Sequence, residues 1–414
     1  MRTLGALSIE CKSGARDTNQ SLRIDQNYGQ VMPQAKHKLV IIGMGDTGVL
    51  CAVRLSRQFE ITAVTTKTSL VSGQELGMRL TNPAWWQQHY NISLQRYRRL
   101  QGVRLVHGRA QSVDIASQHV EVQLANGDLS SVPYDYLLVA SGASNGFWRN
   151  DRILSEGEIE ADIESNAERL RNAGQIDVVG GGPSAVSVAL NTARQFPEST
   201  IALHFSGEKL LRGYHALTRD YYEQALEQAG VIMHPNRRAL VAGHKIDRLG
   251  SGQLTFEDGA VVESDAIVWA TGQVRPHSDF LPDQLLDEQG FVLTDSTLQV
   301  SGHSNLFAIG DVAATDPLRS SARNWAYRVL AHNLVRCAKG KEPNRRFKPP
   351  IHRWGSVVGP QDDGLRIHSQ TGGVQRLTRR LVDHLLLPLV VRRIIYRGVD
   401  RGADLFARWE REKS

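Results

Sequence analysis

Short apolar runs rich in β-branched residues alternate with helical patterns along most of this 414-residue chain. Residues 39–42 form the first run, and a helical pattern follows it. The same order, a run and then a helix, returns from residue 175. Each of these helices is followed by another β-branched run, at 60–65 and at 200–205. Strands that alternate with helices are typical of parallel sheets, so the pattern predicts an α/β fold that contains an internal repeat.

Between and after the repeated units, the pattern predicts further strands, turns and helices. They are a strand over 102–108, a β-meander over 112–135 with a turn at Asn126-Gly127, a strand over 134–142, a charged helix over 155–174, a hairpin and strand over 252–272, a strand over 305–311, a helix over 321–337, and a small hairpin around Trp354-Gly355 and Gly372-Gly373. At roughly 150 residues per domain, the length suffices for two or three domains. Residues 1–36 are polar and lack periodicity, which predicts a flexible tail.

Three glycines follow the first apolar run. Gly43 ends the run, and Gly45 and Gly48 follow it at the spacing Gly-x-Gly-x-x-Gly. Between a strand and a helix, the first glycine permits a sharp turn, the second lets the backbone approach a pyrophosphate, and the third lets the helix pack against the strand. The helix N-terminus then offers its N–H groups to the phosphates. The motif predicts a dinucleotide site, and an ordinary glycine turn is the alternative.

The repeat carries a second motif of the same kind. Gly180 and Gly182 follow the apolar run, and Ala185 stands where the third glycine would be. Pro183 and Ser184 open the helix between them. Two such motifs, each between a strand and a helix, predict two nucleotides bound to one chain.

The strands after the two glycine turns end at residues that would face a nucleotide ribose. An acidic residue usually stands there and accepts from the ribose hydroxyls. The first site has Thr65 instead, followed by Lys67, which would approach a phosphate or lie in a solvated loop. The second has Ser206, with Lys209 and Arg212 just beyond it. The missing carboxylates predict weaker adenosine binding at the first site and a preference for NADPH at the second.

Composition narrows the classes of function. The net charge of +6 is dispersed, and no stretch interleaves aromatic with basic residues, so a nucleic-acid partner is not expected. Cys11, Cys51 and Cys337 lie far apart, which predicts neither a disulfide framework nor a metal site and fits a reducing, cytoplasmic setting. The N-terminal apolar run is too short for a secretion signal, and no run reaches the roughly 18 residues that span a bilayer.

Four features occur in an order known from flavoproteins with two dinucleotide-binding domains. They are the glycine motif at 43–48, Ala-Ser-Gly at 140–142, the second motif at 180–185, and Ala270-Thr-Gly272 together with Gly310-Asp311. Over residues 38–340 the chain therefore resembles the pyridine nucleotide-disulfide oxidoreductase-like flavoproteins. Within them it is most similar to the branch of type II NADH:quinone oxidoreductases and apoptosis-inducing-factor-like proteins, including the ferroptosis suppressor.

The resemblance implies the domain order. Two Rossmann-like domains are expected, with an NAD(P)-binding domain at 146–262 inserted into an FAD-binding domain that consists of 37–145 and 263–340. Residues 341–414 would then form a C-terminal extension.

The resemblance also implies residues for each cofactor. FAD would be held by Gly43, Gly45, Gly48, Thr65, Lys67, Ala110, Ser141, Gly142, Gly310, Asp311 and Trp325. NAD(P)H would be held by Gly180, Gly182, Pro183, Ser184, Ala185, Ser206, Lys209 and Gly272. Asp311 would accept from a ribityl hydroxyl, and the helix N-terminus near Trp325 would stabilise negative charge on the flavin. Hydride transfer to a flavin needs no side chain as acid or base, so no catalytic residue is assigned.

The chain departs from the family in two ways. Disulfide reductases carry two cysteines beside the flavin, and peroxidases and oxidases carry one, but the matching region at 69–82 has none. Disulfide and peroxide chemistry are therefore disfavoured, and Cys51 is expected to be a buried apolar residue. Many relatives place a glutamate on the helix after the second glycine motif, near the position of Ser187 here, which predicts weaker positioning of the nicotinamide.

Residues 376–398 combine apolar residues at helical spacing with flanking arginines. The apolar residues are Leu381, Val382, Leu385, Leu386, Leu389, Val390, Ile394 and Ile395, the arginines are Arg379, Arg380, Arg392, Arg393 and Arg397, and Pro388 interrupts the pattern. A basic amphipathic segment can lie on an anionic membrane, where each basic residue contributes about 1 kcal/mol. The alternative is packing on the protein body or on a second subunit, as in a homodimer.

Together these patterns predict an FAD-dependent NAD(P)H oxidoreductase that passes hydride to FAD and then electrons to an acceptor. A quinone is the favoured acceptor, because it would suit a cytoplasmic protein held at the inner face of a membrane. A reductase of a small ferredoxin-like or rubredoxin-like electron carrier is the first alternative. A redox-sensing flavoprotein with low turnover is the second.

Overall fold

The computed structural model describes residues 35–72, 76–144, 146, 148–241, 246, 248–272, 274–319 and 325–400. Residues 1–35 form a separate unit of the chain, and all that follows concerns the unit that begins at Lys36. The predicted N-terminal tail thus lies almost wholly outside the described residues.

The first sheet contains seven strands in the order β16-β8-β1-β2-β5-β6-β7. Its strands are β1 (Lys38–Ile42), β2 (Glu60–Thr65), β5 (Arg104–Asp114), β6 (His119–Leu124), β7 (Leu129–Pro133), β8 (Tyr136–Val139) and β16 (Leu306–Ala308). β16, β8, β1, β2 and the start of β5 pair in parallel, whereas β5, β6 and β7 pair antiparallel. The predicted meander is therefore confirmed, with Asn126-Gly127 between β6 and β7.

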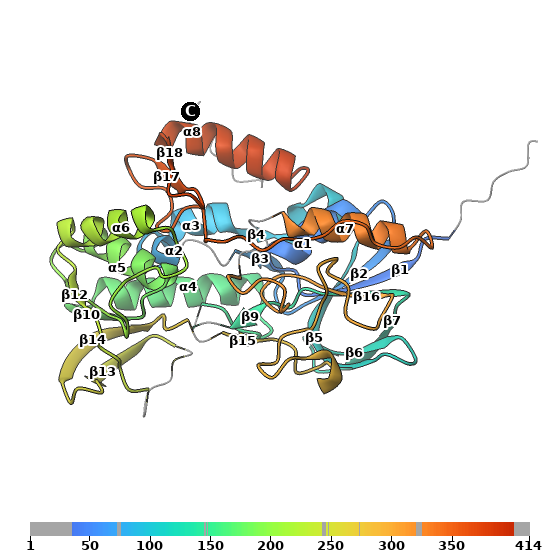
Figure 1. Cartoon of the computed structure of the whole chain (residues 1–414), viewed down its shortest axis with the longest axis horizontal. Helices are drawn as coiled ribbons and strands as arrows, with labels where there is room; N and C mark the ends of the chain where they lie inside the picture. The colour runs from blue at the N-terminus through green and yellow to red at the C-terminus, as the bar shows by residue number, and fades with distance from the viewer. Residues whose placement is uncertain are drawn as a thin grey trace, which may run out of the picture. The chain divides into compact units, whose positions relative to one another are not determined.

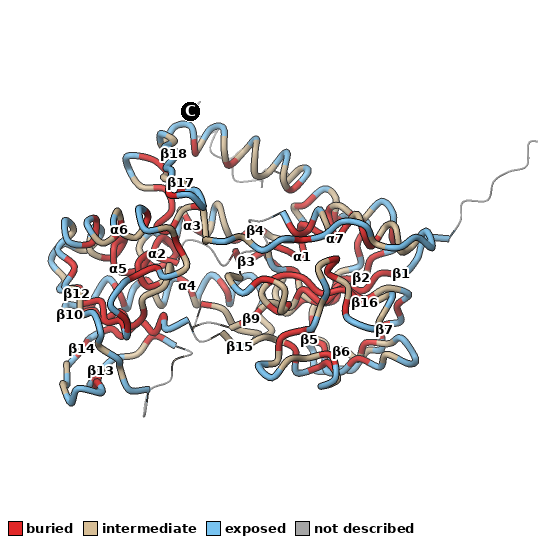
Figure 2. Tube along the Cα trace, in the orientation of Figure 1, coloured by how far each residue is buried: buried red, intermediate tan, exposed pale blue. Residues whose placement is uncertain are grey.

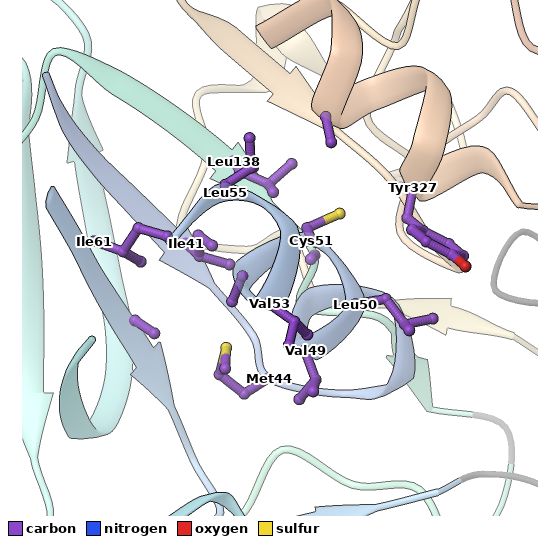
Figure 3. Packing of buried hydrophobic residues seen from close by; sticks show 14 of the residues in the cluster. Ile41, Met44, Val49, Leu50, Cys51, Val53, Leu55, Ile61, Leu138 and Tyr327 are labelled. Atoms are coloured by element: carbon purple, nitrogen blue, oxygen red, sulfur yellow. The ribbon is translucent and has the colours of Figure 1, made fainter. Parts of the chain in front are cut away.

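Helix α1 (Asp46–Leu55) and helix α7 (Ala326–Cys337) lie side by side against this sheet (Figure 1). Figure 3 shows Cys51 of α1 between Leu138 of β8 and Tyr327 of α7. Cys51 is fully buried, and burial raises the pKa of its thiol, so it serves as the small apolar residue that was expected. The predicted helix start at residue 321 lies outside the described residues, and the described part of the helix begins at Ala326.

The second sheet contains five strands in the order β12-β11-β10-β14-β13. Its elements are β10 (Gln175–Val179), α5 (Pro183–Gln195), β11 (Thr200–His204), α6 (Ala216–Gln228), β12 (Ile232–His234), β13 (Gly250–Thr255) and β14 (Val261–Trp269), preceded by α4 (Glu156–Arg171). β10 and β11 are almost continuously buried, whereas β12 and β13 are mostly half-buried or exposed. α4 begins at Ser155 with a capping box, which explains its sharp start.

The predicted boundary at residue 262 is wrong, because it cuts through β14. This strand pairs in parallel with β10 and antiparallel with β13, so the second sheet continues to Trp269. The two sheets share one plan: β8 lies beside β1, and β14 lies beside β10. The Ala-Ser-Gly and Ala-Thr-Gly segments therefore occupy equivalent strand ends in two different sheets.

The chain also contains short elements outside the two sheets. They are β3 (Ser69–Val71), α2 (Leu76–Thr81), α3 (Pro83–Tyr90), β4 (Asn91–Ser93), η1 (Leu94–Arg96), η2 (Arg98–Leu100), β9 (Ala143–Ser144), β15 (Arg275–Pro276) and η3 (Asp283–Leu285). The predicted C-terminal hairpin is confirmed as β17 (Leu365–His368) and β18 (Val374–Leu377), with Gly372-Gly373 in its turn. Trp354 lies outside these strands, and Gly355 only forms a bridge to His368.

The chain then continues as a helix formed by α8 (Arg379–Leu381) and η4 (Val382–Ile395). η4 has i→i+5 hydrogen bonding, as between the Tyr396 N–H and the Val391 carbonyl. Val382 and Leu387 are buried against the hairpin and Trp85, so one face of this helix packs on the protein body as one alternative expected. The exposed apolar residues of this helix are Leu381, Leu385, Leu389 and Ile394. Most of the helix is only half-buried or exposed, as the tan and blue trace in Figure 2 shows.

Candidate functional site

A cavity of ≈320 Å³ lies where the first sheet, the second sheet and the segment before the C-terminal hairpin meet. Gly43 and Gly45 line it from the first glycine turn, Pro183 and Ser184 from the second, and Trp354 from the C-terminal segment. The predicted residues among its lining are Gly43, Gly45, Thr65, Lys67, Ala110, Ser141, Gly142, Pro183, Ser184, Gly310 and Asp311. Those outside it are Gly48, Gly180, Gly182, Ala185, Ser206, Lys209, Gly272 and Trp325.

The first glycine turn leaves space at the N-terminus of α1. Gly43 has φ +99°, and a Cβ there would strike the carbonyl oxygen of Ala140. A Cβ on Gly48 would strike the carbonyl oxygen of Gly43. By contrast, no heavy atom lies within 4 Å of a Cβ built on Gly45. The turn is therefore tight on the protein side and open toward the cavity, which fits a pyrophosphate at the helix N-terminus.

The second glycine turn repeats this geometry with one difference. Gly180 has φ +141°, and a Cβ there would strike the carbonyl oxygen of Ala270. A Cβ on Gly182 would have no heavy atom within 4 Å. Pro183 takes the first helical position, where its missing N–H costs no hydrogen bond. Ala185 is fully buried, so the helix here stands far enough from its strand to accommodate a methyl group.

At the end of β2, Thr65 and Lys67 face the cavity and are bound to one another. The Thr65 hydroxyl donates to the Lys67 carbonyl (2.9 Å), and the Lys67 Nζ donates to the Asn150 carbonyl (2.7 Å). Burial lowers the pKa of Lys67 to about 8, although Asp151 opposes this effect. Lys67 is thus held at the cavity wall and is not a solvated loop lysine.

Charged residues that the sequence did not indicate also line this cavity. The Arg109 Nη2 lies 2.9 Å from an Asp151 oxygen and 2.7 Å from an Asp279 oxygen. Arg149 donates from Nη1 to the Asp311 carboxylate (2.5 Å). A cofactor hydroxyl at Asp311 would therefore share this carboxylate with Arg149. The ion pairs of Arg109 and of Arg149 each join segments far apart in sequence. The sequence indicated Asp311 and Ala110, the neighbour of Arg109, but neither of these pairings.

One further acidic residue stands where phosphates would bind. Asp46 lies in the first turn of α1 and lines the cavity. Its carboxylate accepts from the Ser72 hydroxyl (3.2 Å) and from the Tyr396 hydroxyl (3.4 Å). These two contacts hold the side chain toward β3 and the C-terminal segment. An anionic side chain at this helix end would oppose a bound pyrophosphate.

The strand ends of the second sheet differ from those of the first. His204 and Asp177 are fully buried and pair through Nε2 and Oδ1 (2.7 Å). The imidazole of His204 stacks on that of His234, with ring centroids 4.7 Å apart. These groups face the sheet interior, whereas Ser206 at the predicted ribose position is exposed.

Basic residues lie beside Ser206. Lys209 is exposed, with its Nζ 3.9 Å from a Glu223 oxygen. Arg212 is exposed and forms no ion pair with any described residue, and its guanidinium covers Gly207. The ribose position of the second site therefore offers cations, and no carboxylate contacts Ser206 in the described part of the chain.

Ser187 is a packing residue between helices. Its Oγ accepts a hydrogen bond from the Gly77 N–H (3.1 Å), and it is almost fully buried. A Cβ on Gly77 would strike the carbonyl oxygen of Ser187. Helix α2 thus touches α5 backbone to backbone beside residue 187, and Ser187 also lines the nucleotide cavity.

Among the described residues, no group of three histidines, cysteines, aspartates or glutamates could hold a metal ion. No helix in the described part of the chain is both long and apolar enough to cross a membrane. Trp325 begins α7 with φ +60° and is partly exposed, away from the lining of the nucleotide cavity.

Two Rossmann-like sheets, each with a glycine turn before a helix, and a cavity lined from the first turn and from the start of α5 are typical of a dinucleotide-dependent flavoprotein oxidoreductase. The family model described as "Pyridine nucleotide-disulphide oxidoreductase" matches residues 37–333. The chain belongs to this family, and its cofactors are FAD and NAD(P)H.

Known proteins place the chain within the family. Oxidoreductase ptaL of Pestalotiopsis fici is 30% identical over 57% of this chain, and the match spans 63% of that protein. Type II NADH:quinone oxidoreductase Ndh of Mycobacterium tuberculosis is 26% identical, with 70% of each chain covered. The solved putidaredoxin reductase–putidaredoxin complex superposes with a TM-score of 0.60 at 19% identity, over 84% of this chain and 91% of that one. The last similarity shows a shared fold.

Proposed function

We propose that this protein oxidises NADPH through FAD and passes the electrons to a quinone. The observation that carries the proposal is the cavity lined by Gly43 and Gly45 of the first turn, by Pro183 and Ser184 at the start of α5, and by Trp354. A flavin that extends from the first turn and a nicotinamide that extends from the second would meet in this cavity. When bound, FAD supplies the chemistry that accepts a hydride and releases electrons.

The chain's own residues would bind and orient the two cofactors. The open space beside Gly45 and the N-terminus of α1 would hold the FAD pyrophosphate, and Asp311 would accept from the ribityl chain. The open space beside Gly182 would take the phosphates of NADPH. Trp354 would cover the cavity from the C-terminal side and limit its contact with water.

Arg212 supports the choice of NADPH over NADH. It is exposed, lacks an ion pair among the described residues and lies next to Ser206 at the ribose position. Its guanidinium could bind a 2′-phosphate with two parallel hydrogen bonds. Arg212→Ala should raise the KM for NADPH about tenfold and leave the KM for NADH nearly unchanged. Equal changes for both nucleotides would contradict the assignment.

The test of the proposed reaction is stepwise reduction and reoxidation without oxygen. Yellow protein should be bleached by NADPH faster than by NADH, and a water-soluble quinone should then restore the colour. Protein without flavin absorbance would contradict the whole proposal. Bleaching without reoxidation by quinone would instead support the low-turnover, redox-sensing alternative.

The exposed side of the C-terminal helix supports contact with a membrane, where a quinone would be available. Leu385 and Leu389 are exposed there, together with Arg393. Full-length protein should float with vesicles that contain anionic lipid, and Leu385→Glu/Leu389→Glu should reduce the bound fraction about tenfold. Leu129→Glu, at an exposed leucine of β7, is the matched control. If the double variant instead abolishes a dimer and leaves vesicle binding unchanged, the C-terminal helix would be a contact between subunits.

A reductase of a small electron-carrier protein is the second candidate. The structural similarity to a reductase solved with putidaredoxin favours it. A ferredoxin-type protein would replace the quinone in the reoxidation step. If it restores the flavin absorbance faster than any quinone at equal concentration, this second reaction is preferred.

A further inference from the structure

A second cavity lies between α1, α7, the segment that follows α7, and Arg397. Its volume is ≈720 Å³, and it shares no lining residue with the nucleotide cavity. Among the described residues, seven arginine and lysine side chains line it, and no aspartate or glutamate does. The cavity is therefore a concentrated region of positive charge, which we call the basic cavity.

The cations of the basic cavity are not neutralised by the rest of the described chain. None of the seven forms an ion pair with a described carboxylate. Arg54 instead lies over the Tyr327 ring, 4.9 Å from its centroid, and its buried Nε has no hydrogen-bond partner among the described residues. Arg328 lies over the Trp325 ring at 4.0 Å. Burial lowers the pKa of Arg397, and nearby Arg54 lowers it further. Such mutual repulsion indicates a place for an anion.

The side-chain chemistry narrows the class of anion. Five of the seven cations are arginines, whose planar forks bind phosphate oxygens in pairs. Among the described residues, His332 supplies the only aromatic ring of the lining, and no phenylalanine, tyrosine or tryptophan offers a broad face to a nucleobase. The site is also concave, which suits a compact ligand better than the surface of an acidic protein. We propose that the basic cavity binds a multivalent phosphate that carries no base.

Two sources could present this phosphate. A free oligophosphate could enter from solvent, or a phosphomonoester headgroup could be presented by a lipid surface. Arg397 lies just after Ile394, the last exposed apolar residue of the C-terminal helix, so a headgroup could reach the cavity beside that helix. The proposal is independent of the proposed reductase function, because it is tested by binding.

The test is calorimetric titration of the flavin-loaded, full-length protein with inorganic pyrophosphate. Saturating NADP⁺ is included to occupy the second nucleotide site. Arg345→Glu reverses an exposed cavity charge, and Lys348→Glu makes a comparable change in charge outside the cavity on the same segment. We expect saturable binding that Arg345→Glu weakens at least about tenfold and Lys348→Glu leaves within about twofold. Lys341→Glu is the second variant should Arg345→Glu fail to fold.

Vesicle binding identifies the source. Binding to phosphatidic acid vesicles that free pyrophosphate displaces, and that Arg345→Glu abolishes, would assign a lipid headgroup. Pyrophosphate binding without such vesicle binding would assign a free phosphate. Absence of saturable pyrophosphate binding, or an equal loss in Arg345→Glu and Lys348→Glu, would overturn the proposal.

Discussion

At the first glycine turn, a Cβ on either Gly43 or Gly48 would strike backbone, whereas at the second turn only Gly180 carries this constraint among the equivalent positions. Ala185 replaces the third glycine and is packed without exposure. Helix α1 therefore approaches its own turn more closely than α5 does. The comparison shows that one motif spacing can give a tight nucleotide turn and a looser one in the same chain.

The surroundings of the two turns differ in the same direction. Beside the first, Lys67 is half-buried and Arg149 is paired with Asp311 at the cavity wall. Beside the second, Ser206 and Arg212 are exposed. An enclosed site suits a cofactor that stays bound, and an open site suits a nucleotide that enters and leaves in each turnover. We therefore expect the first site to be the more sensitive to substitution.

The largest expected effect comes from exchanging the third position of the two turns. Gly48→Ala should lower the free energy of unfolding by about 3 kcal/mol, because its methyl group would collide with the Gly43 carbonyl. Ala185→Gly should cost only about 1 kcal/mol, through added freedom of the unfolded chain and a lost methyl contact. Urea denaturation of both variants measures the difference. Equal losses would remove the distinction between a tight turn and a loose one.

Filling the open space at each turn should separate the two nucleotides. Gly45 has φ −71° and Gly182 has φ −89°, which any residue can adopt, so valine should fit both backbones. Gly45→Val should fold but bind flavin more than about a hundredfold more weakly. Gly182→Val should stay yellow and no longer be bleached by NADPH. Flavin absorbance measures the effect in each variant, and far-ultraviolet circular dichroism is the control for folding. Loss of flavin from both variants would contradict the assignment of the two sites.

The Arg149–Asp311 pair offers a smaller effect at the enclosed site alone. Asp311→Asn should weaken flavin binding about tenfold, because it removes a charged acceptor and leaves Arg149 without its partner. The double variant Arg149→Met/Asp311→Asn should lose less than the sum of the two single variants, because they act on one interaction. Flavin fluorescence titration measures each affinity. Strict additivity would show that the pair does not act as a unit.

Lys67 should produce the smallest effect, seen as a pH dependence. Its pKa in the folded protein is about 8, against an ordinary value of 10.5. Between these values the unfolded chain keeps a proton that the folded chain has lost, so the free energy of unfolding should rise with pH over this range. Lys67→Met should lack this rise. The difference in unfolding free energy by which Lys67→Met exceeds the wild-type protein at about pH 7 should therefore be smaller at about pH 10. Lys348→Met, at an exposed lysine, is the control and should keep the pH dependence of the wild-type protein. If Lys67→Met keeps it as well, the lowered pKa of Lys67 would be contradicted.

Patterns that depend on neighbouring residues could be predicted from the sequence. The glycine spacing, the alternation of strands and helices, and the Asn126-Gly127 turn are set within a few residues of one another, and all of them are confirmed. The boundary at residue 262 was wrong because the hairpin strand β14 also serves as a parallel strand beside β10. Only pairing at a distance reveals that second role.

Lys67 and Asp311 were expected at the site, but the ion pairs of the site lay beyond such reasoning. Arg149 follows β9 and Asp311 follows β16, and the fold brings these two distant segments together. The role of Ser187 was equally hidden, because the approach of Gly77 on another helix determines it. The apolar spacing of residues 376–398 predicts a helix. That spacing does not distinguish i→i+5 hydrogen bonding from the ordinary i→i+4 pattern, so the form of the C-terminal helix could not be predicted.

The contact between Gly77 and Ser187 also limits how the protein can move. α2 and α5 meet backbone to backbone, so they should travel as one rigid body. A hinge that opened this junction would have to break a buried hydrogen bond and expose close-packed helices. We therefore expect rotation between the two nucleotide-binding halves at the two-residue strands β9 and β15, which pair where the chain passes between the halves. Those four residues are where a change in the distance between the two nucleotides would originate.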